Sequence, residues 1–276
     1  MTLDLETVAD EALVSAVDGE PTRPYPEQLR RVLAERRART GGRSDFLPLP
    51  YHRPVAACML EAAEDGGIVR VVDIASWTDR KGDEPEFLAR AWDRLAGASL
   101  VTFHGKGFDL PVMELRSLKH AIAIPGSSPG RRGGGISEHL DLKELLSAHG
   151  SAGAAPLDLY AKLVGLPGKE DVAGGDVQSL YCAGSLEQIA AYCMTDVVQT
   201  WLVYLRWRRV EGSLTADGYD ESVASAREAL PLLFARRLPP DQRLLLDAFL
   251  ERCAPFLGNG RELTTGERRY AARALT

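Results

Sequence analysis

Two apolar stretches joined by a glycine turn constrain the fold of this chain more than any other feature. Residues 55–62 and 67–75 have the composition of strands, and the sequence between them reads Glu64-Asp65-Gly66-Gly67. Asp-Gly and Gly-Gly pairs between two apolar runs are the strongest local signal of a hairpin. We therefore expect two neighbouring antiparallel strands in a sheet.

The segments around this hairpin alternate between strand and helix patterns. Strands are predicted at residues 2–7, 99–103 and 139–142, and helices at residues 27–39, 85–95, 109–121, 142–148, 157–164 and 186–207. Three more helices are predicted after residue 220, separated by Pro231 and by the Leu238-Pro239-Pro240 break. This order fits an α/β fold, the ribonuclease H-like arrangement: a mixed five-stranded sheet with helices on both faces, a central opening strand and C-terminal helices. We expect one domain over residues 1–210 and a helical extension over residues 211–276.

Composition limits the cellular setting and the kind of partner. No apolar run approaches the roughly 20 residues that cross a bilayer, and Asp4, Glu6 and Asp10 stand where a secretory signal needs a basic start and an apolar stretch. We expect a cytoplasmic location without a membrane partner. The four cysteines are far apart and lack zinc-site spacing, so we expect them to be reduced. The net charge of −6 argues against coating of nucleic acid by bulk electrostatics, although a nucleic-acid enzyme could use local basic patches and cations.

The opening strand carries two acids that face the same way. Side chains alternate along a strand, so Asp4 and Glu6 project together while Leu3 and Leu5 point into the opposite layer. Two carboxylates at close range raise each other's pKa unless a cation lies between them. Taken alone, the pair could also be the solvated side of an edge strand. Asp73 ends a similar stretch, but Ala75 stands where the second acid would be, so we expect Asp73 to lie outside any site.

Two further acids occupy positions that could meet this pair. Asp109 follows the glycine-bearing turn at residues 104–107 and begins a helix, and Asp196 follows Tyr192 by four residues on one face of an apolar helix. Each has a simpler alternative, as a helix-start residue or as a surface acid. With the opening strand in the centre of the sheet, these segments should converge on it. Four convergent carboxylates suit two hard cations.

The motifs together resemble those of the DEDD superfamily of 3′-5′ exonucleases, in the form with a tyrosine in the third motif. Asp4-Leu5-Glu6-Thr7 resembles the first motif, residues 104–109 the second and Tyr192-x-x-x-Asp196 the third. More narrowly, the chain is similar over residues 1 to about 210 to predicted 3′-5′ exonucleases related to the proofreading domain of family-B DNA polymerases. The likeness extends to residues 46–50, 107–112, 139–142 and 165–169. It departs from the usual pattern at His104, where Asn is usual.

The resemblance implies hydrolysis of the terminal phosphodiester at a 3′ end with two divalent cations, Mg²⁺ or Mn²⁺, about 3.5–4 Å apart. The resemblance implies that Asp4 would bridge both cations. Glu6 and Asp196 would bind the cation that carries the attacking water, and Asp109 would help to bind the other cation. Tyr192 would orient that water. Candidates for contact with the phosphate, the leaving group or another part of the substrate are His104, Lys106, Phe108, Arg131 and Arg132.

The expected substrate is single-stranded DNA or a 3′ overhang, in DNA repair or nucleic-acid processing. Two alternatives stay open: a 3′-5′ exoribonuclease, because nothing in the sequence selects against a 2′-hydroxyl, and a catalytically silent nucleic-acid-binding module of the same fold. The arginine-rich helix at residues 27–39 is either a solvated face or a phosphate contact. The residues do not identify a protein partner.

Overall fold

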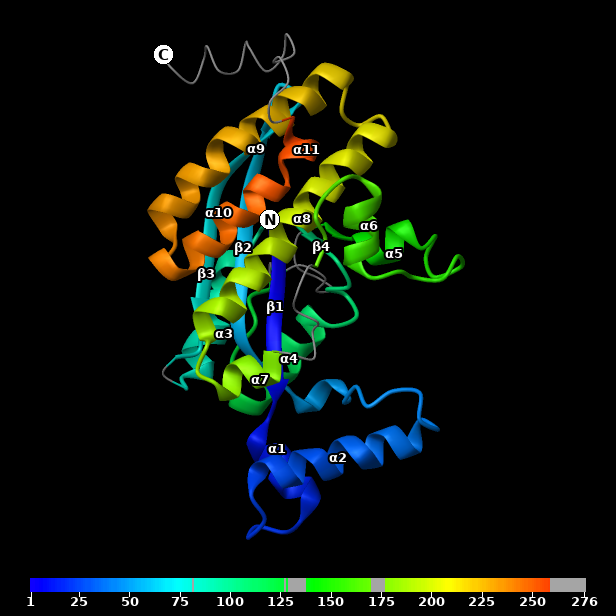
Figure 1. The fold of residues 1–276 in the computed structure, drawn as a ribbon, viewed down its shortest axis with the longest axis vertical. Helices are drawn as coiled ribbons and strands as arrows, with labels where there is room; N and C mark the ends of the chain where they lie inside the picture. The colour runs from blue at the N-terminus through cyan, green and yellow to red at the C-terminus, as the bar shows by residue number, and fades with distance from the viewer. Residues whose placement is uncertain (81, 127, 129–137, 170–176, 259–276) are drawn as a thin grey trace.

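A mixed five-stranded sheet forms the centre of the protein (Figure 1). The computed structural model describes residues 1–80, 82–126, 128, 138–169 and 177–258. The strands lie in the order β3-β2-β1-β4-β5, and β1 is central, as predicted. Strand β1 pairs antiparallel with β2 and parallel with β4, and β4 pairs parallel with β5. The strands are β1 (Thr2–Ala9), β2 (His52–Asp65), β3 (Ile68–Thr78), β4 (Leu100–Thr102) and β5 (His139–Asp141).

The predicted hairpin is confirmed as β2 and β3. Asp65 pairs with Ile68 across the turn, and the two turn residues Gly66 and Gly67 have φ angles of 59° and 76°. Positive φ at both central positions matches the right-handed twist of the flanking strands, and glycine adopts it without strain. The hairpin places β2 beside β1, where it supports the strand that carries the first two acids.

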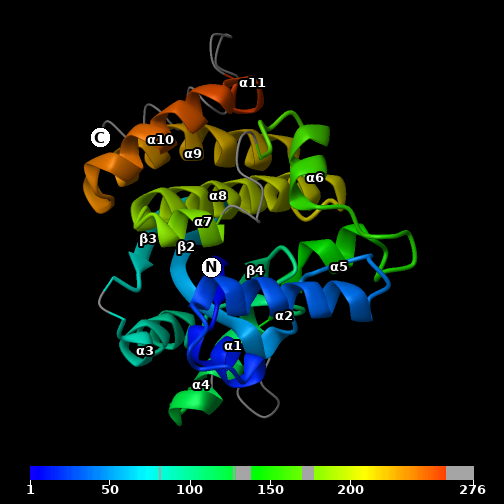
Figure 2. The same cartoon turned by 60° about the horizontal axis from the view of Figure 1, so that its bottom comes forward.

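Helices cover both faces of the sheet, as the sequence predicts. On one face, α3 (Glu84–Leu95) and α4 (Asp109–His120) bury Trp92 and Met113 against the Leu3 and Leu5 side of β1. The other face is covered by α8 (Leu186–Val210) and α9 (Ala216–Arg237), and α10 (Pro240–Arg252) and α11 (Ala254–Leu257) pack on these helices. Figure 2 shows α9 and α10 beyond α8. The mixed-sheet α/β architecture is therefore confirmed, and the division at residue 210 stays a prediction.

The C-terminal helices differ from the prediction at one point, because α9 continues through Pro231. A proline inside a helix removes a hydrogen bond and clashes with the preceding turn. Here Leu230 and Phe234 are fully buried in the main core. Packing on both sides of Pro231 therefore outweighs the local preference for a break.

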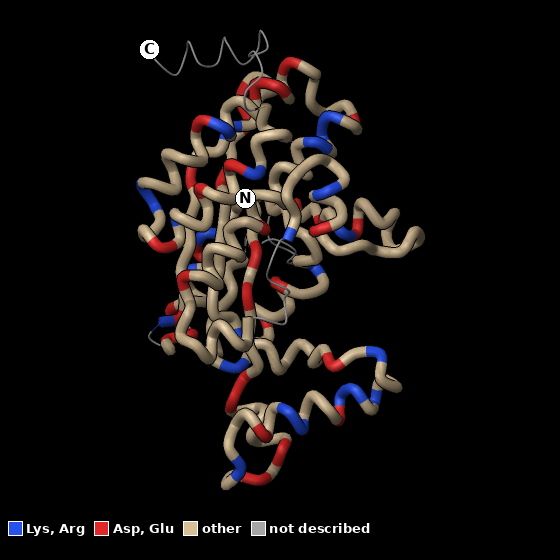
Figure 3. Tube along the Cα trace, in the orientation of Figure 1, with Lys and Arg blue, Asp and Glu red and all other residues tan. Residues whose placement is uncertain are grey.

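A helical arm, residues 10–48, projects from the end of β1 (Figure 1). It consists of α1 (Glu11–Asp18), α2 (Tyr25–Arg39) and the returning loop, and a small core of Val14, Val32 and Leu47 holds it together. Lys and Arg residues are frequent along α2 (Figure 3). The helix α1 was not predicted, although Asp10 caps it and Gly19 ends it with a φ of 73°.

The base of the arm is tied to α3 and α4 by buried charges. Arg116, only 3% exposed, binds the carboxylates of Asp10 and Glu84, and Lys119 Nζ lies 2.7 Å from Asp10 Oδ2. Burial opposes ionisation, but hydrogen bonds from Lys119 and Arg116 hold the pKa of Asp10 below its ordinary value. The start of the arm is thus anchored to the sheet domain.

Four short helices complete the described structure. They are the 3₁₀ helix Leu49–Tyr51, α5 (Leu142–Leu146), α6 (Leu157–Leu163) and α7 (Val177–Cys182). Helix α7 was not predicted. Within the described residues, no helix combines the length and the apolar character needed to span a membrane.

Candidate active site

Strand β1 places Asp4 and Glu6 on the face that α8 covers. Leu3 and Leu5 are 2% and 4% exposed on the opposite face, which fixes the alternation of the strand. Across the antiparallel ladder, Asp4 pairs with Cys58 and Glu6 with Ala56. Both small residues are fully buried, and the Cys58 thiol donates to the Ala190 carbonyl on α8 at 3.2 Å.

Helix α8 brings Asp196 to this pair. One turn before it, the Cys193 thiol donates a hydrogen bond to the backbone carbonyl of Asp4 at 3.2 Å, which fixes α8 on β1. Asp4, Glu6 and Asp196 can each offer a carboxylate oxygen, and these oxygens lie within 4.8 Å of one another. The three acids therefore form a compact site with the oxygen ligands that hard cations prefer.

Asp109 joins the cluster through the backbone of β1. Its Oδ1 accepts a hydrogen bond at 3.0 Å from the N–H of Leu5, the residue between the two strand acids, and its side chain is buried. The sharp turn before α4 makes this contact possible. A Cβ added at Gly105 would lie 2.6 Å from the Thr102 side chain, so the turn requires glycine.

The carboxylate of Asp141 holds the same turn in place. It accepts hydrogen bonds from the N–H groups of His104 at 2.9 Å and Lys106 at 3.0 Å, and it also caps the start of α5 through Lys143 and Glu144. Asp141 lies in the segment 139–142, which resembles the exonuclease family, but no role was predicted for it. Its role is to link β5 to the turn that positions Asp109.

The four acids shift one another's protonation in the absence of a cation. Burial raises the pKa of Asp4, and the neighbouring Asp109 and Glu6 raise it further. Burial and the charge of Asp196 raise the pKa of Glu6 to about 8, and burial raises the pKa of Asp109 to about 7. The pKa of Asp196 is also raised by burial, although Lys169 opposes the shift. A bound divalent cation would remove the repulsion that opposes ionisation.

Lys169 is a member of the site that the sequence analysis did not identify. Its Nζ lies 2.6 Å from Asp196 Oδ2. Its backbone is held by Asp158, which accepts from the Lys169 N–H at 2.6 Å, and the preceding Gly168 N–H donates to Gln199 Oε1 at 2.8 Å. Burial would lower the pKa of Lys169, but the carboxylates of Asp196 and Glu6 raise it above its ordinary value. The only indication in the sequence was that Lys169 ends the segment 165–169, which resembles the exonuclease family.

Tyr192 lies one helical turn before Asp196, as its spacing predicts. Its hydroxyl accepts a hydrogen bond at 3.0 Å from Nε2 of Gln188, which also lies on α8, and this bond orients the phenol. Asp73, in contrast, lies on β3 and binds Arg237 Nε at 2.8 Å. It lies outside the cluster, in agreement with the sequence analysis.

The predicted substrate-contact residues lie around the turn before α4. His104 and Lys106 are exposed there, His104 with a φ of 72° and Lys106 paired to Glu144 Oε2 at 2.7 Å. Burial and the charge of Lys143 lower the pKa of His104. Phe108 is half-buried beside Asp109. Arg131 and Arg132 lie outside the described residues.

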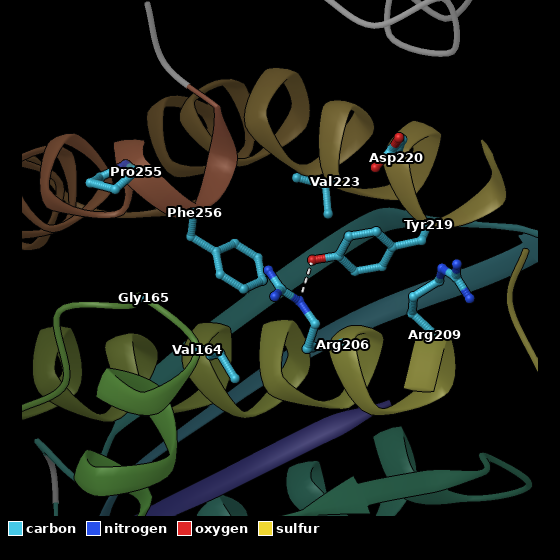
Figure 4. A pocket seen from close by; sticks show the side chains of 9 residues that line it. All are labelled: Val164, Gly165, Arg206, Arg209, Tyr219, Asp220, Val223, Pro255 and Phe256. Atoms are coloured by element: carbon cyan, nitrogen blue, oxygen red, sulfur yellow. Dashed lines mark hydrogen bonds between the residues drawn. The ribbon is translucent and has the colours of Figure 1, made fainter. Parts of the chain in front are cut away.

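A separate cavity of about 440 Å³ lies near the other end of α8 (Figure 4). Arg206 and Arg209 line it from α8, Tyr219 from α9 and Phe256 from α11, and Arg206 Nε donates to the Tyr219 hydroxyl at 2.8 Å. Arg206 is ten residues beyond Asp196, or about 15 Å along the helix axis. With Asp220 as its single acidic lining residue, this cavity does not offer the carboxylate set found at β1.

The comparison with protein families agrees with this geometry. Residues 44–239 match a family described as a predicted 3′-5′ exonuclease related to the exonuclease domain of PolB. The chain belongs to this family. The matched range of this exonuclease family member includes Asp109, Lys169, Tyr192 and Asp196. Asp4 and Glu6 lie before the first matched residue. No curated protein matches the chain. The resemblance seen in the sequence is thus confirmed, and the structure adds the placement of the two β1 acids beside the matched segments.

Proposed function

We propose that the protein removes nucleotides from the 3′ end of single-stranded DNA or a 3′ overhang by hydrolysing the terminal phosphodiester. The observation that carries the proposal is the convergence of Asp4, Glu6 and Asp196, with their carboxylate oxygens within 4.8 Å of one another and Asp109 bonded to the backbone between the first two. A DNA substrate and a role in DNA repair accord with the family's relation to the exonuclease domain of a DNA polymerase.

The donor set suits two hard divalent cations, Mg²⁺ or Mn²⁺. The clustered acids offer only carboxylate oxygens, and burial together with the charge of Asp196 raises the pKa of Glu6 to about 8. A cation among these carboxylates would favour their ionised forms. Asp4, Glu6, Asp109 and Asp196 would hold the cations. When bound, the cations would supply Lewis acidity and lower the pKa of a water molecule.

The other residues of the site would bind and orient the reactants. The Tyr192 hydroxyl, held by Gln188, would accept or donate a hydrogen bond to the attacking water. Lys169 Nζ, which pairs with Asp196, would contact a non-bridging oxygen of the scissile phosphate once cations neutralise the acids. His104, Lys106 and Phe108 lie on the adjacent turn, where the terminal nucleotide would contact them.

Degradation of an oligodeoxynucleotide labelled at its 5′ end tests the proposal. We expect a ladder shortened from the 3′ end with Mg²⁺ or Mn²⁺, and no products with EDTA. Loss of a cation ligand removes several kcal/mol of transition-state stabilisation, so Asp4→Asn and Asp196→Asn should lower the rate about 1,000-fold or more.

The matched control is Asp73→Asn, which removes a strand acid outside the cluster and should keep the wild-type rate. A ribo-oligonucleotide of the same sequence, run in parallel, tests the preference for DNA. Wild-type rates in both Asp4→Asn and Asp196→Asn would refute the assignment of the site.

A further inference from the structure

The arm carries a positive charge that contrasts with the rest of the chain. Residues 30–43 contain six arginines and one glutamate, whereas the net charge of the whole protein is −6. Figure 3 shows these basic residues along α2 and the loop that follows it. A local basic surface on an acidic protein is the electrostatic footprint expected of a phosphate-binding face.

Several of these arginines have no acidic partner among the described residues. Arg31 and Arg39 lie near Glu35, but Arg37 and Arg43 form no ion pair there, and the Arg43 guanidinium donates only to the backbone carbonyl of Thr40. Both side chains belong to exposed residues. Their charge is therefore free to bind an anion from solution.

An aromatic cluster of Phe46, His52 and Phe108 lies where the end of the arm meets the turn before α4. Phe46, which is 56% exposed, lies 5.8 Å from Phe108 and 4.9 Å from His52, measured between ring centroids. Arg36 Nε donates to the Phe46 backbone carbonyl at 2.9 Å, which ties this part of the loop to α2. Phe108 directly precedes Asp109 in the chain. The aromatic cluster thus joins the end of the arm to the residue before one of the four acids.

Thr7 on β1 and the backbone of Leu47 hold His52, one ring of this aromatic cluster, in place. His52 Nδ1 lies 2.9 Å from the hydroxyl of Thr7, the residue after Glu6, and its other nitrogen lies 3.1 Å from the Leu47 carbonyl. His52 on β2 thus links the arm to β1, and the contacts of Asp10 with Arg116 and Lys119 link the arm to α4. The basic surface is therefore held in a defined position relative to the acids.

We propose that the arm is a binding surface for one nucleic-acid strand upstream of its 3′ end: Arg37 and Arg43 contact phosphates, and Phe46 stacks on a base. The inference rests on the proposed function, because it places the 3′ end of that strand at the acids. The ligand is single-stranded, since only an unpaired base exposes a face to Phe46. The family match begins at residue 44, so it does not cover α1 and α2.

Equilibrium binding of a 5′-fluorescein-labelled 12-mer of oligodeoxythymidylate, measured by anisotropy in EDTA, tests the arm separately from catalysis. Each phosphate contact on a single strand contributes about 0.7 to the slope of log affinity against log salt concentration. The double variant Arg37→Gln/Arg43→Gln should therefore lower this slope by about 1.4. Phe46→Ala should weaken binding about tenfold and leave the slope unchanged, because stacking releases no counterions.

The control is Arg209→Gln/Arg236→Gln, which removes the same charge from exposed positions on α8 and α9. It should keep the wild-type slope. An unchanged slope in the arm variant, or an equal fall in the control, overturns the proposal.

The degradation assay on the same variants separates the two proposals. If the arm variant loses salt-dependent binding while Asp4→Asn and Asp196→Asn keep full turnover, the arm proposal stands and the catalytic assignment fails. If the slope is unchanged while those two variants are inactive, the catalytic assignment stands and the arm proposal fails.

Discussion

Replacing Glu6 by Gln should stabilise the protein at alkaline pH in the absence of divalent cations. The pKa of Glu6 is raised from 4.5 to about 8 by burial and by Asp196, so the folded state holds a proton that the unfolded state releases between these values. Stability attributable to Glu6 therefore falls as pH rises from about 4.5 to 8. The full shift corresponds to at most about 5 kcal/mol at pH 8. Because the residue is only half-buried, we expect about 2 kcal/mol.

Urea denaturation in EDTA at pH 5 and pH 8 measures this difference. Glu6→Gln should exceed the wild type in unfolding free energy by about 2 kcal/mol at pH 8 and by little at pH 5, because at pH 5 Glu6 is protonated in the folded state. Glu114→Gln removes an exposed acid from α4 and should change stability by less than about 0.5 kcal/mol at both values. A Glu6→Gln protein less stable than the wild type at pH 8 would refute the account, since the acid would then be stabilising the metal-free fold.

Three further substitutions test the anchor of the arm, the turn before α4 and the role of Lys169. Arg116→Met leaves the buried carboxylates of Asp10 and Glu84 without their partner, and it should lower the unfolding free energy by about 3–5 kcal/mol in urea; a loss below about 1 kcal/mol would contradict the assigned role. Gly105→Ala places a Cβ 2.6 Å from the Thr102 side chain and should cost about 1–3 kcal/mol, whereas Gly126→Ala, at a position with no atom within 4 Å of the added Cβ, should be near neutral. Lys169→Met should lower kcat about 10- to 100-fold, the value of a charged hydrogen bond, and an unchanged kcat would exclude a phosphate contact.

The sequence predicted the relative positions of the acids where local pattern decides the geometry. The alternation of side chains along β1 could be predicted because Leu3 and Leu5 fill the face opposite the acids. The i, i+4 spacing placed Tyr192 and Asp196 on the same side of α8. The central position of β1 followed from the order of strands and helices. The resemblance to an exonuclease family, now confirmed, connected these local patterns to one chemistry.

The features that the sequence did not predict depend on contacts between distant residues. Lys169 belongs to the site only because folding brings the segment after α6 against Asp196, a contact that no local spacing shows. Asp141 holds the turn at His104 from 37 positions away in sequence. Helix α9 continues through Pro231 because its neighbours pack into the core. Helix α1 is different, since its Asp10 cap and its Gly19 end are local signals that could have been recognised in the sequence.

Crystals of the protein soaked in Mn²⁺ test the central claim most directly, because the anomalous signal of the ion locates it without reference to activity. We predict two peaks about 3.5–4 Å apart, both within coordination distance of Asp4 and shared among Glu6, Asp109 and Asp196. In crystals of Asp4→Asn grown under the same conditions, both peaks should weaken or vanish. Ions bound elsewhere in the wild-type protein, with none among these four carboxylates, would contradict the account.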